Sequence, residues 1–243
     1  MAEITETPKN KATASSDYGG HLEGKANINL FSGKAEDILR VLLVKYPKTW
    51  TLREICKEAK VSLRWASVVS RALINERVAL RDSSRGGLKV MAPVDLLRRW
   101  ANYRNFAANT RFLDYYMADD DISILFTRFK NKQGPDYAFT CLAGAVLSAP
   151  FVRPMSAHIY VKDEKDAKYW ANTVGLKPIE KGGNVKFAIA GASDVFYGSY
   201  LIHDTRVVSD VQLYVDLLNY PGRGEEAAGE IMKKIEAKWK SKE

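Results

Sequence analysis

Apolar residues recur at helical spacing from residue 34 onwards. In residues 34–46 they fall at Ile38, Val41 and Leu42, which is the i, i+3, i+4 pattern of one helix face. Pro47 cannot continue a helix, so the segment ends there. We therefore predict an amphipathic helix over residues 34–46.

Two further helices are predicted from capping residues that stand before apolar stripes. Thr51 precedes Glu54 by three residues, the spacing of a capping box, and begins a second helix. Ser62 caps a third helix that extends to about Asn75. The third helix is expected to bury its aliphatic positions, which are Leu63, Ala66, Val69, Ala72 and Leu73.

The hydrophobic period changes after the third helix. Residues 77–81 and 88–91 alternate between apolar and polar side chains, and the segment between them contains Gly86 and Gly87. The glycines favour a tight connection, so the two strands are predicted to form a hairpin. Two helices joined by a tight turn and followed by a hairpin are the order of a winged helix-turn-helix, whose usual target is a groove of duplex DNA.

The outer face of the third helix has the composition expected of a DNA-contacting surface. Arg64, Ser67, Val68 and Arg71 lie on it, and no acidic residue occurs before Glu76. A carboxylate would repel phosphate, whereas an ordinary solvated face usually carries both signs of charge. The residues predicted to contact DNA are Ser62, Arg64, Trp65, Ser67, Ser70 and Arg71 on the helix, and Arg81, Arg85 and Lys89 on the hairpin.

The hairpin cations and Trp65 are expected to have roles other than reading bases, or have two possible roles. The hairpin cations are expected to hold phosphates rather than to read bases. Trp65 fits two roles, because it either packs against the sugar–phosphate edge or covers the core beside Leu52. The helix-turn-helix fold also occurs in protein-interaction modules, so the fold alone does not identify the partner.

The distribution of charge favours a polyanion as that partner. The chain of 243 residues has a formal net charge of +8. Residues 33–105 hold 16 Lys and Arg against 7 Asp and Glu, whereas residues 106–243 hold 18 of each. The basic excess therefore lies around the predicted helices and hairpin.

Composition and a proline divide the chain into three parts. Residues 1–32 are rich in Thr, Ser, Lys, Gly and Asn and are predicted to be a flexible tail. Pro93 opens a linker helix with cationic residues that either extend the DNA-contacting surface or face solvent. These residues are Arg98, Arg99 and Arg104. We place the domain boundary near residue 105, so residues 33–105 form the winged helix and residues 106–243 form a second domain.

The second domain alternates between strand and helix patterns. Predicted strands cover residues 110–117, 157–161, 185–189 and 194–202. Predicted helices cover a segment capped by Asp120 or Asp121, and residues 137–148, 165–174, 210–218 and 225–239. The expected fold is therefore α/β (α+β), a winged helix-turn-helix followed by a mixed domain with a central sheet.

No catalytic or metal-binding motif is recognised in either part. A glycine-rich phosphate loop, a nucleophile elbow and a Cys/His cluster at ligand spacing are all missing from the sequence. The acidic residues 119–121 have no neighbours that complete a metal site, and His158 is expected to be a packed sheet residue rather than a catalyst. We expect neither an enzyme nor a bound cofactor or metal.

Cysteine usage and hydropathy predict a cytoplasmic protein. Cys56 and Cys141 lie in apolar patterns far apart in sequence and are expected to be free thiols, as in a reducing compartment. No apolar run approaches the ~18 residues of a membrane span. Residues 1–20 have no apolar leader segment, so neither export nor a membrane partner is expected.

Residues 207–228, VVSDVQLYVDLLNYPGRGEEAA, resemble the closing motif of the AbiEi-family antitoxins of type IV (abortive-infection) toxin–antitoxin systems. That family shows a Ser-Pro-x-Gln-x-Tyr-x-Asp-Leu run, then Pro-Gly-Arg-Gly and a helix, and Asp210 stands where the family has its proline. The matching residues are Ser209, Gln212, Tyr214, Asp216, Leu217, Pro221, Gly222, Arg223 and Gly224. With the small-residue segment 140–145, the segment from residue 195 and the winged helix, the likeness covers roughly residues 33–240.

The resemblance implies an autoregulatory repressor. Its first domain would bind an inverted-repeat operator in double-stranded DNA, which leaves the oligomeric state open, with a dimer on DNA as one arrangement. Its second domain would act as antitoxin against a nucleotidyltransferase-like toxin, without requiring a stable complex. The alternative is a standalone winged-helix regulator whose second domain senses a ligand or a partner protein.

The closing motif also has an interpretation from helix geometry. Gln212 and Asp216 are four residues apart and can pair, whereas Tyr214 points to the opposite side. Arg223 follows a Pro-Gly turn and is predicted to return to Asp216, locking the last two helices together. A ligand-contacting role for the same residues is the alternative.

Overall fold

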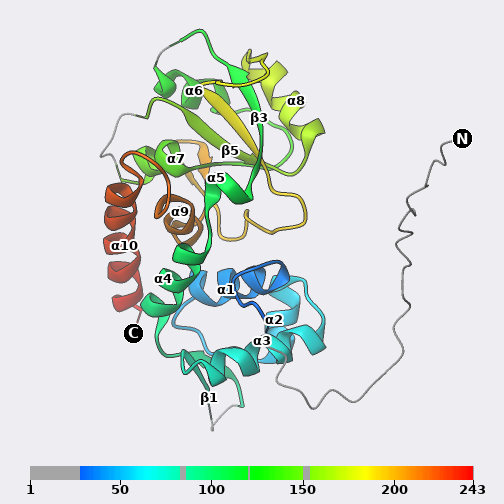
Figure 1. The fold of residues 1–243 in the computed structure, drawn as a ribbon, viewed down its shortest axis with the longest axis vertical. Coiled ribbons are helices and arrows are strands. Elements are labelled where there is room, and N and C mark those ends of the chain that lie inside the picture. Colours follow the sequence, from blue (N-terminus) through cyan, green and yellow to red (C-terminus); the bar gives the residue numbers. More distant parts are fainter. Residues whose placement is uncertain (1–27, 83–85, 120, 150–153, 243) are drawn as a thin grey trace, which may run out of the picture.

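A computed structural model describes residues 28–82, 86–119, 121–149 and 154–242. The chain is mixed α/β, with four helices and a short hairpin at one end and a seven-stranded sheet with its covering helices at the other (Figure 1). The first end contains α1 (Lys34–Val44), α2 (Leu52–Ala59), α3 (Leu63–Asn75), β1 (Ala79–Arg81), β2 (Leu88–Val90) and α4 (Pro93–Tyr103).

The helix starts and the hairpin of the first end follow the predictions from local sequence. The Thr51 side chain accepts from the Glu54 backbone N–H while the Glu54 carboxylate accepts from the Thr51 N–H, so the predicted capping box is confirmed. The Ser62 hydroxyl accepts from the Trp65 N–H at the start of α3. The hairpin pairs β1 with β2 antiparallel, and Trp50 exchanges both backbone hydrogen bonds with Leu88 beside it.

Two positions on α3 differ from the prediction. Leu63, assigned to the buried face, is 55 % exposed, and Ser70, assigned to the DNA-contacting face, is 3 % exposed. The buried face of α3 is centred on Ala66, Val69 and Leu73. At 100° per residue, this centre places Leu63 at the edge of the face and Ser70 inside it.

The second end contains the remaining elements. These are α5 (Phe106–Asn109), β3 (Arg111–Tyr116), α6 (Ile122–Phe129), β4 (Tyr137–Thr140), α7 (Cys141–Ser148), β5 (Ala157–Val161), α8 (Glu164–Val174), β6 (Lys177–Pro178), β7 (Val185–Ile189), β8 (Tyr200–Ile202), β9 (Thr205–Val207), α9 (Asp210–Leu217) and α10 (Gly224–Lys240). The sheet order is β6-β3-β7-β5-β4-β9-β8, with β5–β7 and β4–β9 parallel and the other pairs antiparallel.

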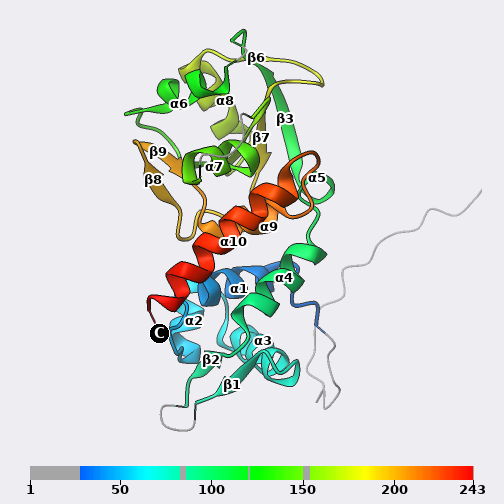
Figure 2. The ribbon, with the colours of Figure 1, turned by 90° about the vertical axis from the view of Figure 1, so that its left-hand side faces the viewer.

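The sheet lies between two helical layers. Helices α6 and α8 cover one face, and α7, α9 and α10 lie on the other (Figures 1 and 2). Side chains alternate between the faces along each central strand, so Ile159 belongs to the core under α6 and α8, whereas Tyr160 belongs to the opposite core. The prediction of a central sheet is confirmed.

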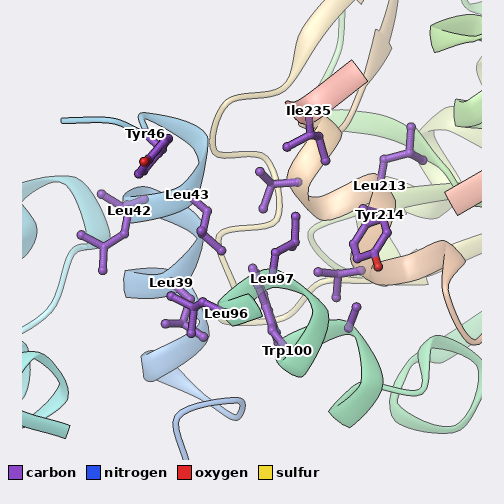
Figure 3. Packing of buried hydrophobic residues seen from close by; sticks show 14 of the residues in the cluster. Leu39, Leu42, Leu43, Tyr46, Leu96, Leu97, Trp100, Leu213, Tyr214 and Ile235 are labelled. Carbon is purple, nitrogen blue, oxygen red and sulfur yellow. The ribbon is translucent and has the colours of Figure 1, made fainter. Parts of the chain in front are cut away.

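The core on the α9 side continues into the first end of the molecule. Leu43 of α1, Trp100 of α4, Leu213 of α9 and Ile235 of α10 belong to one buried cluster (Figure 3). Helix α10 runs from the sheet toward α1 and α2, where the Trp239 and Tyr46 ring centroids are 5.2 Å apart (Figure 2). The segments on the two sides of residue 105 therefore share one hydrophobic core.

Three segments depart from the predicted elements. Residues 137–148 were predicted to be one buried helix but form strand β4 followed by helix α7, with a sharp turn at Cys141, whose φ is 50°. A short uncharged run fits a buried strand and a buried helix equally well. Only Tyr200–Ile202 of residues 194–202 is a strand. Leu30 is 6 % exposed, so packing begins inside the predicted tail, whose residues 1–27 lie outside the described residues.

Candidate nucleic-acid interface

Arg64 and Arg71 lie on the exposed side of α3, two helical turns and about 10 Å apart along the axis. Neither side chain forms an ion pair with another described residue. Their neighbour Arg99 on α4 differs, because it pairs with Glu76 at 2.8 Å. The exposed side of α3 therefore carries positive charge that the fold leaves unneutralised.

The hairpin extends this unneutralised surface. Arg81 and Lys89 are exposed on β1 and β2, and neither forms an ion pair within the described part of the chain. Both ribbon views place α3 and the hairpin together at the end of the molecule farthest from the sheet (Figures 1 and 2). Arg85, the third predicted hairpin contact, lies outside the described residues.

The remaining predicted contacts on α3 do not all face solvent. Ser67 is partly exposed beside the two arginines, and Ser62 is exposed although its hydroxyl caps the helix. Trp65 packs against the core and its indole N–H is buried, so the core-covering role holds for this residue. Ser70 is buried and is withdrawn from the predicted surface, because a duplex cannot reach a side chain inside the core.

Three exposed cations near this surface were missed by the sequence-based assignment. They are Arg53 and Lys57 on α2 and Arg77 before β1, and none of them forms an ion pair with a described residue. The available signal for Arg53 and Lys57 was their position opposite the apolar stripe of α2.

Behind this surface lies a buried polar cluster that joins the two ends of the molecule. We call it the junction cluster, and its members are Glu36, Asp37, Arg40, Arg104, Thr140, Tyr160, Gln212 and Asp216. The Arg40 guanidinium is fully buried, with Nη1 2.7 Å from Asp37 Oδ1 and Nε donating to Gln212 Oε1 at 2.9 Å. Helix α1 is thereby tied to α9 through a residue pair 172 positions apart.

Asp216 is the acceptor at the centre of the junction cluster. Its carboxylate accepts from Gln212 Nε2 at 2.8 Å, from the Thr140 hydroxyl at 2.7 Å and from the Tyr160 hydroxyl at 3.2 Å. Arg104 Nε lies 3.6 Å away. Burial raises the pKa of Asp216, and the nearby Arg104 and the donated hydrogen bonds only partly offset that rise.

Arg104 replaces the arginine predicted to reach Asp216. Besides Asp216 it contacts Glu36, with Nη1 2.8 Å from Oε2, so it neither faces solvent nor extends the DNA-contacting surface. Arg223 begins α10 after the Gly222 turn and instead donates twice to Glu226, at 2.7 Å each. The predicted contact between Arg223 and Asp216 is therefore wrong. The cation near Asp216 is Arg104, which follows the last residue of α4.

The closing-motif residues of α9 and its cap are buried as well. Ser209 caps α9 by accepting from the Gln212 N–H, and the predicted Gln212–Asp216 pair is confirmed. Tyr214 is 4 % exposed, on the side of α9 that packs toward α4 (Figure 3). These side chains join elements to one another and leave little surface for a ligand.

A loop of the second end also holds the first end. The Asp194 carboxylate lies 2.8 Å from Lys60 Nζ, and the Tyr197 hydroxyl donates to Glu58 at 2.8 Å. A cavity of about 230 Å³ lies beside this loop, with walls from both ends of the molecule. Its polar lining includes Lys34, Glu36, Arg104, Asn109, Thr110 and Ser193.

A second polar cluster, which the sequence did not reveal, contains a serine and a lysine. Lys234 Nζ of α10 lies 2.6 Å from Ser148 Oγ, 2.8 Å from the Tyr200 hydroxyl and 3.0 Å from Asp210 Oδ1. Burial lowers the pKa of Lys234, but its hydrogen bonds to Tyr200 and Asp210 outweigh burial and raise it overall. A protonated lysine cannot accept the serine proton. The hydrogen bonds of Lys234 instead tie α10 to α7 and α9.

His158 is packed in the sheet, as predicted. It lies on β5 at 4 % exposure, between the edges of Phe106, Phe112 and Tyr220. Burial lowers its pKa to about 4, with a contribution from Lys186. Cys56 and Cys141 are free thiols. Among the described residues no three His, Cys, Asp or Glu side chains gather as a metal site, and no helix is long and apolar enough to cross a membrane.

The chain was compared with models of known protein families. The family model for the AbiEi antitoxin, a transcriptional regulator of type IV toxin–antitoxin systems, matches residues 89–237. This range includes the last two residues of β2, the linker helix α4, the whole seven-stranded sheet and the closing motif. Neither the curated proteins nor the solved structures gave a match to the chain.

Proposed function

Because the chain belongs to the AbiEi antitoxin family of type IV toxin–antitoxin regulators, we propose that it is a DNA-binding repressor of its own operon. The observation that carries this proposal is the exposed, unpaired positive charge of α3 and the β1–β2 hairpin. Helices α2 and α3 with that hairpin form a winged helix-turn-helix in this interpretation. Such a repressor acts in the cytoplasm, on an inverted-repeat operator.

The proposal assigns different tasks to the exposed cations. Arg64 and Arg71 are placed where side chains of a second helix enter a major groove, and each can contact a guanine edge or a phosphate. Arg81 and Lys89 on the hairpin hold the phosphate backbone beside the groove. Because a duplex releases condensed cations when such residues bind, affinity should fall steeply with salt.

A mobility-shift assay at fixed salt tests the DNA-binding role. The probe is a duplex from upstream of the chain's own gene. The double substitution Arg64→Ala/Arg71→Ala is expected to weaken binding about 30-fold or more, since each arginine contact contributes about 1–3 kcal/mol. The control is Arg111→Ala/Arg223→Ala, which removes the same charge from exposed arginines of the second end. Equal affinities of the two double variants would overturn the proposal.

We further propose that the second end carries antitoxin activity against a nucleotidyltransferase-like toxin, without catalysis and without requiring a stable complex. Support comes from the family match, which spans the whole seven-stranded sheet and α10 as far as residue 237. The test uses the full chain, because the two ends share one core. Arg64→Ala/Arg71→Ala should lose repression yet still rescue growth when the toxin is expressed from an independent promoter. Loss of rescue in this variant would contradict a separate antitoxin role.

The alternative function is a regulator that responds to a small molecule. The cavity of about 230 Å³ between α1 and the sheet supports this alternative, because a ligand there would contact both ends of the molecule. Growth rescue distinguishes the two functions. An antitoxin neutralises a co-expressed toxin, whereas a standalone sensor changes only transcription.

A further inference from the structure

The first residue of α3 is a leucine that the fold leaves in solvent. Leu63 is 55 % exposed, while Ala66, Val69 and Leu73 of the same helix are fully buried. A single exposed apolar side chain is ordinary on a protein surface. Leu63 is notable because it stands at the start of α3, beside the unpaired arginines of this helix, and not because of its exposure alone.

Leu63 heads the row of side chains that the candidate interface presents. Residues 63, 67 and 71 are spaced by four, so they follow one another along one side of α3. The row begins with Leu63, continues with the partly exposed Ser67 and ends with the unpaired Arg71. An apolar group, a hydroxyl and a guanidinium thus occupy successive turns of α3, a helix without a carboxylate between Leu63 and Asn75.

Duplex DNA offers a specific partner for such an apolar group. The major-groove edges carry hydrogen-bond donors and acceptors, and their one apolar group is the C5 methyl of thymine. Residues near the N-terminus of the second helix contact base edges in helix-turn-helix proteins. Since leucine can neither donate nor accept a hydrogen bond, the thymine methyl is the groove group that it can bind favourably.

We propose that Leu63 packs on the methyl group of one thymine and so makes the chain prefer thymine at that position. The inference rests on the proposed DNA-binding function and adds a specificity-determining residue to it. Burial of one methyl group should strengthen binding about four-fold, which is the discrimination expected between thymine and uracil.

The test replaces the methyl group alone. A tight-binding duplex is first selected from a random pool with the full chain, and each thymine is then replaced singly by deoxyuridine. With the wild-type chain, one replacement should weaken binding about four-fold. With Leu63→Ala, binding is weaker overall and the same replacement has no further effect. The control Leu201→Ala removes a leucine of 59 % exposure on β8 and should retain the full effect of the replacement.

The outcomes separate this inference from the function on which it rests. If Leu63→Ala keeps the uracil penalty, or if no thymine replacement weakens wild-type binding, the role of Leu63 is overturned. The DNA-binding proposal survives that result when Arg64→Ala/Arg71→Ala still abolishes binding to the selected duplex. If selection enriches no sequence, both the inference and the sequence-specific function are overturned.

Discussion

Two pairs of arginines in the same stretch of chain have opposite surroundings. Arg64 and Arg71 are exposed on α3 without an ion pair among the described residues. Arg40 is buried in the junction cluster, Arg104 retains only 13 % side-chain exposure there, and the two pair with carboxylates at 2.7 and 2.8 Å. The net charge of a segment counts all four alike. Only the ion pairs within the fold show which guanidinium groups remain available to an external polyanion such as DNA.

The difference also separates two physical roles. An exposed cation is solvated in the free protein and can exchange its hydration for phosphate at little cost to folding. A buried cation has lost its water, so it is favourable only while its carboxylate and amide partners are in place. We therefore expect the first pair to govern binding and the second pair to govern stability.

The largest expected effect is on the free energy of unfolding. Arg40→Ala leaves the Asp37 carboxylate buried without its closest cation and should lower stability by about 3–5 kcal/mol. Arg64→Ala removes an exposed side chain and should change stability by no more than about 0.5 kcal/mol. Urea unfolding followed by circular dichroism measures both variants.

A milder variant keeps this prediction testable if Arg40→Ala does not fold. Arg40→Lys retains the charge but loses the Nε hydrogen bond to Gln212, so its loss of stability should be intermediate. Similar unfolding midpoints for Arg40→Lys, Arg64→Ala and the wild type would show that the junction cluster does not stabilise the fold.

Local sequence was sufficient to predict several helix starts, including those of α2 and α3 in the proposed DNA-binding region. Thr51, Ser62 and Ser209 cap helices with hydrogen bonds that span only three residues, so each cap can be recognised from its own segment. The same holds for the Gln212–Asp216 pair, which lies within one helix. Interactions of this range depend on spacing, and spacing is visible in a sequence.

The junction cluster was not predictable for the opposite reason. Arg104 and Asp216 are 112 positions apart, and nothing local to either residue indicates the other. Arg223, which is close in sequence, was the natural but wrong partner. Leu63 was wrongly predicted to be buried because it is apolar and lies beside the apolar face of α3. Which edge of that face is covered depends on the tertiary fold, which local sequence does not show.

The pH dependence of stability should also distinguish the buried region from the exposed one. Burial lowers the pKa of His158 from 6.5 to about 4, so the unfolded chain takes up a proton before the folded chain does. Stability from this residue is present above pH 6.5 and is lost as the pH falls toward 4, by about 3 kcal/mol in total. Burial raises the pKa values of Glu36 and Asp216, which gives the opposite dependence.

A difference measurement isolates the histidine from those carboxyl groups. His158→Asn should flatten the loss of stability between pH 6.5 and 4 relative to the wild type. If the free energy of unfolding, measured with urea, changed with pH in the same way for the wild type and for His158→Asn across this range, the lowered pKa of His158 would be refuted.

The smallest expected effect is on the salt dependence of DNA binding, and it distinguishes the two arginine pairs most directly. Each cation that neutralises a phosphate contributes about 0.9 to the slope of log affinity against log salt concentration. Arg64→Ala/Arg71→Ala should therefore reduce the magnitude of the slope by up to about 2 if both arginines contact phosphate, and by less if one of them binds a base edge. Arg40→Lys should leave the slope unchanged, because residue 40 lies inside the protein, where its side chain cannot reach a phosphate. A reduced slope for Arg40→Lys in titrations between 50 and 200 mM salt, a range of about four-fold, would mean that the junction cluster opens when the duplex binds.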